Sequence, residues 1–232
     1  MELIEMRGIH KYYNKGTASQ VHALRGADLT VSKGEMVAIL GKSGSGKSTL
    51  LHIMGCIDTA DEGFYYLEDK EAGQCSQKEL AALRNRKIGF VLQEFGLILH
   101  KSVFENITYP LLFNPQVKNR EIPARVKQVL ELVGIPEKAD SKVEELSGGQ
   151  KQRAAIARAL VNDPEILLAD EPTGALDSET SREIMELMKS LNEQGKTVVI
   201  VTHDSLVAEY CCRKVVIVDG MIEEAQTGSS AE

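Results

Sequence analysis

The chain has 232 residues, 43% of them hydrophobic and 26% charged, a composition typical of a globular protein. Its formal net charge of −7 disfavours nucleic acid as a partner, because no overall basic field attracts a phosphate backbone. Its apolar runs fall short of the roughly 18 residues of a membrane helix, and acids at the N-terminus disfavour a secretory signal, so a cytoplasmic location is expected. The four cysteines, Cys56, Cys75, Cys211 and Cys212, contain no C-x-x-C pair, which disfavours a zinc or disulfide framework.

The first third of the chain predicts strands followed by a phosphate-binding loop. Residues 3–13 and 21–31 alternate like strands, and 36–40 is a short apolar strand. The loop "GKSGSGKST" (41–49) then fits G-x-x-x-x-G-K-[ST] and precedes a predicted helix over 47–54. In such a loop backbone N–H groups bind phosphates, the lysine faces the β- and γ-phosphates and the following hydroxyl suits Mg²⁺. The predicted phosphate-binding residues are Gly41, Ser43, Gly44, Ser45, Gly46, Lys47, Ser48 and Thr49.

The middle of the chain, about 97–158, has a helical pattern and is expected to be inserted into the core. Before it, the short strand "IGFVLQ" ends at Gln93, which could coordinate a metal, sense a γ-phosphate or be a surface amide. Near its end, "LSGGQ" (146–150) precedes a predicted helix over 151–160. A serine and two glycines there are typical of an anion site at a helix N-terminus.

The last third predicts a parallel sheet covered by helices. Segments 166–170, 197–203 and 214–220 are nearly continuous apolar strands, as in sheets buried on both faces. Between them an amphipathic helix, with apolar residues at 184, 187, 188 and 191, ends at Gly195. Such alternation favours a doubly wound α/β core.

Three polar residues at the strand ends are candidates for chemistry. Asp170 is suited to hold Mg²⁺ beside the phosphate loop. Glu171 is expected to point the other way and to polarise an attacking water. His203 ends the next strand, where it is either a polar terminus or a phosphate contact.

The order of these motifs resembles the nucleotide-binding domain of ABC ATPases over essentially the whole chain: the phosphate loop, Gln93, "LSGGQ", "ILLADE" (166–171), "GALD" (174–177) and His203. The resemblance implies a P-loop NTPase (RecA-like) α/β core with a mixed sheet, an antiparallel β-subdomain and an inserted α-helical subdomain. It divides a single domain into 1–96 with 159–221 for the β-subdomain and core, 97–158 for the helical subdomain, and a tail over 222–232.

In that family two domains form a head-to-tail dimer around two ATP molecules, each held by one subunit's phosphate loop and by the other's signature motif, which corresponds to "LSGGQ" (146–150) here. The resemblance implies that Lys47, Gln93, Glu171 as general base and His203 as γ-phosphate contact are catalytic. It assigns Mg²⁺ to Ser48, Gln93 and Asp170. Tyr13 is expected to stack on adenine, with Tyr12 as the alternative. The residues expected to face the partner's nucleotide are Ser147, Gly148, Gly149, Gln150 and Asp177.

Within the family the motifs are similar to the ATPases of lipoprotein release (LolD), macrolide export (MacB) and antimicrobial-peptide resistance. The resemblance implies separate transmembrane permease subunits, a peripheral position on the inner face of the membrane, and export or extraction of a lipoprotein, peptide or drug. A non-transporting ATPase that regulates a cell-wall enzyme through a membrane partner is the alternative. The predicted docking surface is 93–109, whose apolar residues are equally candidates for the core, and Val143 stands where relatives often carry proline.

Overall fold

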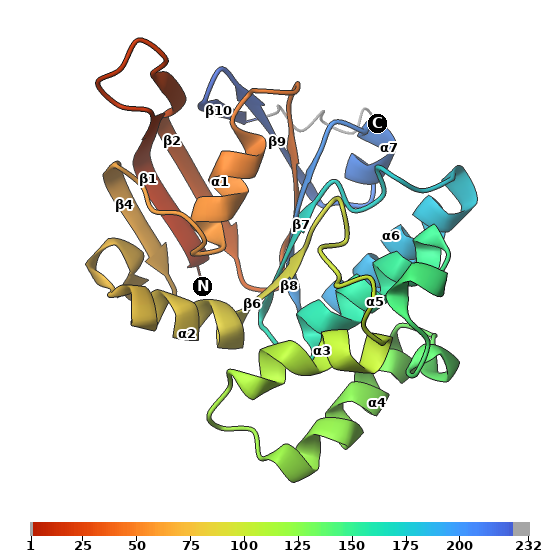
Figure 1. Cartoon of the computed structure of the whole chain (residues 1–232). Coiled ribbons are helices and arrows are strands. Elements are labelled where there is room, and N and C mark those ends of the chain that lie inside the picture. Colours follow the sequence, from red (N-terminus) through yellow and green to blue (C-terminus); the bar gives the residue numbers. More distant parts are fainter. Residues whose placement is uncertain (1, 225–232) are drawn as a thin grey trace.

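Two β-sheets flank a short helix, and four longer helices cover the far face of the larger sheet (Figure 1). The structure, a computed structural model, describes residues 2–224. The smaller sheet is antiparallel, in the order β2-β1-β4-β5, and consists of β1 (Glu2–Tyr13), β2 (Val21–Ser32), β4 (Glu62–Leu67) and β5 (Lys70–Glu71). The larger, in the order β10-β9-β3-β8-β7-β6, consists of β3 (Met36–Leu40), β6 (Ile88–Val91), β7 (Ile166–Asp170), β8 (Thr197–Thr202), β9 (Arg213–Val218) and β10 (Met221–Glu224).

The helices are divided between the two faces of the larger sheet. They are α1 (Lys47–Met54), α2 (Gln77–Lys87), α3 (Val103–Leu112), α4 (Ile122–Leu132), α5 (Gly148–Leu160), α6 (Ser178–Glu193) and α7 (Ser205–Ala208). Helix α1 packs between the two sheets, and its residues share one core with β1, β2 and β4. Helices α3 to α6 form a second core with the opposite face of the larger sheet. Because β3, β7 and β8 are covered on both sides, nearly all of their residues are buried and apolar.

The observed elements confirm the predicted fold class. The strands predicted over 3–13, 21–31 and 36–40 lie within β1, β2 and β3, and the helix predicted over 47–54 is α1. The parallel sheet predicted from the apolar segments is present as β3, β6, β7, β8 and β9, which pair in parallel, while β10 pairs antiparallel with β9. The predicted end of the helix at Gly195 is also found, since α6 ends at Glu193 and Gly195 has φ +95°.

Three predicted boundaries differ from the structure. Helix α5 begins at Gly148 rather than at 151, because a capping box between Ser147 and Gln150 offsets the poor helix propensity of the two glycines. Helix α5 continues to Leu160, past the predicted end of the helical subdomain at 158. The predicted start of the tail at 222 falls within β10, which pairs with β9 as far as Glu224; the rest of the predicted tail lies outside the described residues.

The four cysteines are free thiols, with Cys56 and Cys211 buried. Among residues 2–224, no helix has the length and apolar character that crossing a bilayer demands.

Candidate nucleotide-binding site

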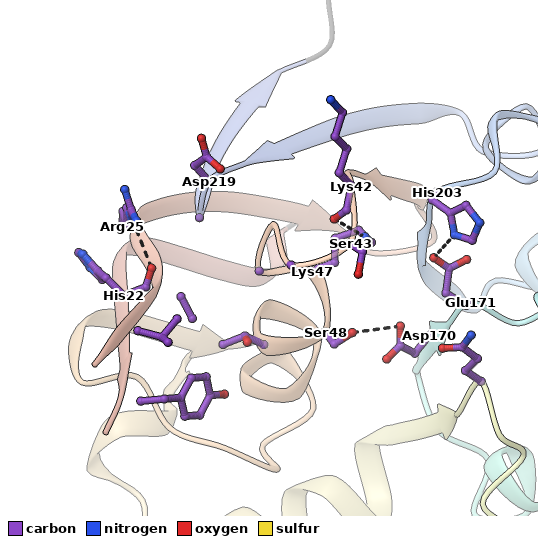
Figure 2. Close-up of a pocket in the computed structure, with 18 residues that line it drawn as sticks. His22, Arg25, Lys42, Ser43, Lys47, Ser48, Asp170, Glu171, His203 and Asp219 are labelled. Carbon is purple, nitrogen blue, oxygen red and sulfur yellow. Dashed lines mark hydrogen bonds and ion pairs between the residues drawn. The ribbon is translucent and has the colours of Figure 1, made fainter. Parts of the chain in front are cut away.

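Four neighbouring strands of the larger sheet end at the same edge and bring the predicted site residues together. The phosphate loop follows β3, and His203 follows β8. Asp170 ends β7 with Glu171 directly after it, and Gln93 follows β6. Parallel strands place their carboxyl ends side by side, which is where open α/β sheets bind ligands. A cavity of about 800 Å³ opens at this edge (Figure 2).

Most of the predicted residues line this cavity. They are Tyr13, Ser43, Gly44, Gly46, Lys47, Ser48, Thr49, Gln93, Asp170, Glu171 and His203. Gly41 and Ser45 of the same loop do not line the cavity and pack against each other, since a Cβ on Gly41 would lie 2.5 Å from the Ser45 hydroxyl. The Ser45 Oγ is buried and has no hydrogen-bond partner among the described residues. The close packing around Gly41 therefore leaves no room for a side chain at this position of the loop.

The phosphate loop has the properties of an anion site. Gly46 adopts a left-handed φ of +105°, and no side chain caps the first turn of α1, so its N–H groups are free to bind an anion. A Cβ on Gly46 would lie 2.6 Å from the Ala23 carbonyl oxygen, which excludes other residues there. The Lys47 ammonium donates to the carbonyls of Gly41 (2.7 Å) and Lys42 (3.0 Å) and is held inside the loop. A triphosphate would thus meet both N–H donors and a positive charge.

Asp170 and Ser48 offer oxygen ligands for a divalent cation at the wall of the cavity. The Ser48 hydroxyl donates to Asp170 Oδ1 at 3.4 Å (Figure 2), and the Gln93 amide lies beside Gly174 nearby. Burial raises the pKa of Asp170, although the Ser48 hydrogen bond and the charges of His52 and Lys47 oppose it. Burial destabilises the ionised form of Asp170, so a bound cation would stabilise the carboxylate, and Mg²⁺ prefers oxygen ligands such as these.

Glu171, next to Asp170, lines the same cavity, where the two carboxylates have different hydrogen-bond partners. Its left-handed φ of +46° is uncommon for a residue with a side chain and indicates local backbone strain. Glu171 Oε1 accepts from His203 Nδ1 at 2.6 Å (Figure 2). Its Oε2 accepts from the Thr202 hydroxyl at 3.0 Å. With 11% of its side chain exposed against 69% for His203, the carboxylate is fixed beneath an accessible imidazole.

The far end of the cavity is formed by the smaller sheet. Tyr13 lines it, whereas the Tyr12 ring stacks on His22, with ring centroids 4.1 Å apart. The structure therefore favours Tyr13 over Tyr12 as the aromatic platform. Residues that sequence patterns did not identify also line the cavity, namely Val21, His22, Ala23, Arg25, Asp219 and Gly220. Of these residues, Asp219 and Gly220 form an Asp-Gly pair, which is a turn pattern visible in the sequence. This turn contacts the phosphate loop through a hydrogen bond from Gly220 N–H to the Ser45 carbonyl.

The signature segment lies apart from this cavity. None of the described residues that line it belongs to 147–150, and Asp177 is also absent from its walls. Ser147 is exposed and caps α5, and Asp177 caps α6. The two helix starts pack together closely, since a Cβ on Gly149 would lie 2.6 Å from Thr180 Cγ2. Each chain therefore presents a second, separate helix N-terminus to its surroundings.

Comparisons with known proteins agree with this arrangement. The family model described as ABC transporter matches residues 24–174. An uncharacterized ABC transporter ATP-binding protein of Thermotoga maritima is 47% identical over 223 residues, 96% of this chain and 94% of that protein. The macrolide export ATP-binding/permease protein MacB of Chlorobaculum tepidum is 44% identical over 220 residues, 95% of this chain but only 33% of MacB, so the chain spans about a third of that relative. The dimeric post-hydrolysis structure of the ATP-binding cassette MJ0796 with ADP and Pi has a TM-score of 0.87 and 42% identity, covering 95% of this chain and 98% of that one.

Proposed function

The chain belongs to the ABC transporter family, and from this premise we propose that it hydrolyses ATP in composite sites shared by two copies of itself. It is an ATP-binding subunit and an ATPase of the LolD/MacB group. The observation that carries the proposal is the separation of the two anion sites. The phosphate loop lines a cavity with Glu171, but the signature residues 147–150 lie outside it and are available to another subunit.

Each residue of the cavity has a distinct task in this proposal. Lys47 and the N–H groups of α1 bind the β- and γ-phosphates. Tyr13 stacks on the adenine. Glu171 accepts a proton from the attacking water, and His203 orients that carboxylate through its 2.6 Å contact while it reaches the γ-phosphate. Ser48, Gln93 and Asp170 would hold Mg²⁺, which supplies charge neutralisation at the phosphates when bound.

The second copy supplies the donors that the cavity lacks. Ser147, Gly148 and Gly149 of one chain face the γ-phosphate held by Lys47 of the other, with Asp177 as a further contact across the dimer. Dipole and free N–H groups at the start of α5 favour a negative charge there. Gln150 contributes indirectly, since its carboxamide is engaged with the Ser147 N–H at 3.1 Å. The dimeric state of the MJ0796 cassette supports this arrangement.

A membrane permease is the second partner in this proposal, and it places the protein at the inner face of the cell membrane. Ile98 and Leu99 are exposed, whereas Val103 is buried in the core. Within the range 93–109, the permease therefore docks on the loop before α3 in this proposal. That loop pairs with the segment before the signature motif: Val143 N–H donates to the Lys101 carbonyl and Glu144 N–H to the Leu99 carbonyl, each at 3.0 Å. Val143 thus forms a bond that proline could not form. A movement of the docked permease would be transmitted through these hydrogen bonds to the signature motif and to α5, which begins within it.

The cargo class in this proposal is a lipoprotein, peptide or drug, by analogy with the MacB relatives, whose name specifies macrolide export.

Ser147→Arg tests the composite site directly. The substitution places a bulky cation where the partner's nucleotide would bind, so ATP hydrolysis should stop. ATP binding to the monomer should be unaffected, because Ser147 lies outside the cavity of its own chain. Lys47→Ala is the contrasting variant and should lose binding itself. Unchanged turnover by Ser147→Arg would contradict the shared site.

A further inference from the structure

A cluster of hydrogen bonds fastens the loop after α1 to the end of β1, next to the cavity. Tyr12 N–H donates to Asp61 Oδ2 at 2.6 Å, and Asp61 N–H donates to the His10 carbonyl at 2.9 Å. The Lys11 ammonium donates to Asp58 Oδ1 at 2.7 Å and to the Thr59 carbonyl at 2.8 Å. These hydrogen bonds join residues almost fifty positions apart in sequence, and they lie directly before Tyr13 in the chain.

Lys11 is at the centre of this cluster. It is a buried lysine, with 8% of its surface exposed, and buried lysines are rare unless their charge is paired. Its partner Asp58 is ionised, since hydrogen bonds from Lys11 and the Thr59 N–H outweigh the effect of burial and keep the pKa of Asp58 below its usual range. The pair is thus a fixed local structure rather than a transient surface contact.

The same pair contacts Tyr13 twice. The Tyr13 hydroxyl donates to Asp58 Oδ2 at 3.1 Å, and the Lys11 ammonium lies 5.5 Å from the centroid of the Tyr13 ring. Tyr13 is 37% exposed and lines the cavity, so without these contacts its ring would be free to change rotamer. Tyr12 contacts His22 instead and leaves this end of the cavity to Tyr13.

Asp58 is also tied to the helix that carries the phosphate loop. Its N–H and that of Ile57 donate to the His52 carbonyl in the last turn of α1, at 3.2 Å and 2.9 Å. Helix α1 begins with Lys47 and has only eight residues. One short, buried helix therefore positions both Lys47 at its start and the acceptor of Tyr13 just after its end.

We propose that Lys11 and Asp58 are positioning residues for base recognition, which hold the Tyr13 ring at the cavity wall in the orientation that stacks on adenine. The inference rests on the proposed function, in which this cavity binds ATP. An aromatic ring that is already oriented loses less conformational entropy when a base stacks on it, so binding is tighter. The effect acts on the base and not on the phosphates.

Two ligands separate these effects in a binding measurement. Isothermal titration calorimetry with the non-hydrolysable ATP analogue adenylyl imidodiphosphate reports base and phosphate together, and inorganic tripolyphosphate reports the phosphate site alone. Lys11→Met should raise the Kd of the nucleotide analogue about threefold to tenfold, a part of the full value of one base–aromatic stack. The Kd of tripolyphosphate should not change. Lys70→Met is the matched control: it removes an exposed lysine of β5, in the same sheet as Lys11, that pairs with Glu79 of α2, and it should alter neither Kd.

A double-mutant cycle shows whether Lys11 acts through Tyr13. In a Tyr13→Ala background, Lys11→Met should have no further effect on nucleotide affinity. Tyr13→Phe keeps the ring and removes only the hydroxyl that bonds Asp58, so it should weaken the analogue slightly, and it serves if Lys11→Met does not fold. Equal weakening of both ligands by Lys11→Met, a persistent effect in the Tyr13→Ala background, or unchanged affinity in Tyr13→Phe would overturn the inference. Wild-type protein that bound neither ligand would instead overturn the proposed function, and the inference with it.

Discussion

Replacement of Glu171 by glutamine is the sharpest perturbation of the proposed chemistry, because it changes the charge and basicity of the side chain with little change in shape. The carboxylate accepts from Thr202 at 3.0 Å and from His203 at 2.6 Å. The glutamine carbonyl oxygen can still accept from Thr202, and its amide can donate to a neutral His203. The fold, the left-handed backbone and the cavity should therefore survive the change.

The expected loss is the contribution of a general base. Such a group contributes about 10²–10⁴ in rate, equal to ~2.7–5.5 kcal/mol of activation free energy. Glu171→Gln should thus bind ATP normally, lower kcat by that factor and accumulate as an ATP-bound dimer, since hydrolysis no longer separates the subunits. Phosphate release gives kcat, size-exclusion chromatography with Mg²⁺ and ATP gives the oligomeric state, and thermal unfolding checks the fold. A variant that retained full activity and stayed monomeric would refute the assignment of Glu171 as the base.

Three further predictions concern the surroundings of the same site. Thr202→Val removes the buried donor to Glu171 and leaves a carboxylate oxygen unpaired, so kcat should fall and unfolding free energy should drop by about 1–3 kcal/mol, whereas Thr202→Ser should restore kcat. Gly149→Ala places a Cβ 2.6 Å from Thr180 Cγ2 and should destabilise the fold by about 1–3 kcal/mol in a denaturant titration; adding Thr180→Ser, which removes that methyl, should recover the loss. Asp170→Asn should stabilise the ligand-free protein at neutral pH while it abolishes Mg²⁺-dependent hydrolysis. The sign follows from the raised pKa of Asp170, because such a group contributes stability that is present at low pH and lost as pH rises through its folded pKa. The advantage of Asp170→Asn should therefore shrink as the pH is lowered through the usual aspartate range, and an equal advantage at every pH would contradict the role of burial.

Local patterns in the sequence predict the parts of the site that depend on short spacings. The loop around Lys47, the strand end at Asp170 and the parallel strands all follow from residues close together in the chain, and the structure brings them to one edge of the sheet. The helix that starts at Gly148 shows the limit of propensity alone. Two glycines argue against helix there, yet reciprocal hydrogen bonds between Ser147 and Gln150 extend it.

Other features depend on contacts between distant residues, which spacing does not reveal. Lys11 and Asp58 are 47 positions apart, and their pairing depends on how β1 lies against the loop after α1. His22 lines the cavity because β2 passes beside the phosphate loop, although its own surroundings in sequence resemble any alternating strand. The strand β10 has only four residues, two of them acidic, and is defined by its pairing with β9 rather than by its composition.

The central claim is that each nucleotide is bound between two copies of the chain, and mixing two inactive variants tests it most directly. Lys47→Ala lacks a working phosphate loop but keeps its signature motif, and Ser147→Arg has the reverse defect. In a mixed dimer one site combines the intact phosphate loop of the second variant with the intact signature motif of the first, and the other site carries both defects.

Equal mixing makes half of the dimers mixed, and one of the two sites in each is then intact, so hydrolysis should recover to about one quarter of the wild-type rate if the sites act independently. Each variant alone should remain inactive over the same protein concentrations. Recovery on mixing is the result that the shared site predicts. A mixture no more active than its separate components, from variants shown to fold and to form mixed dimers, would contradict it.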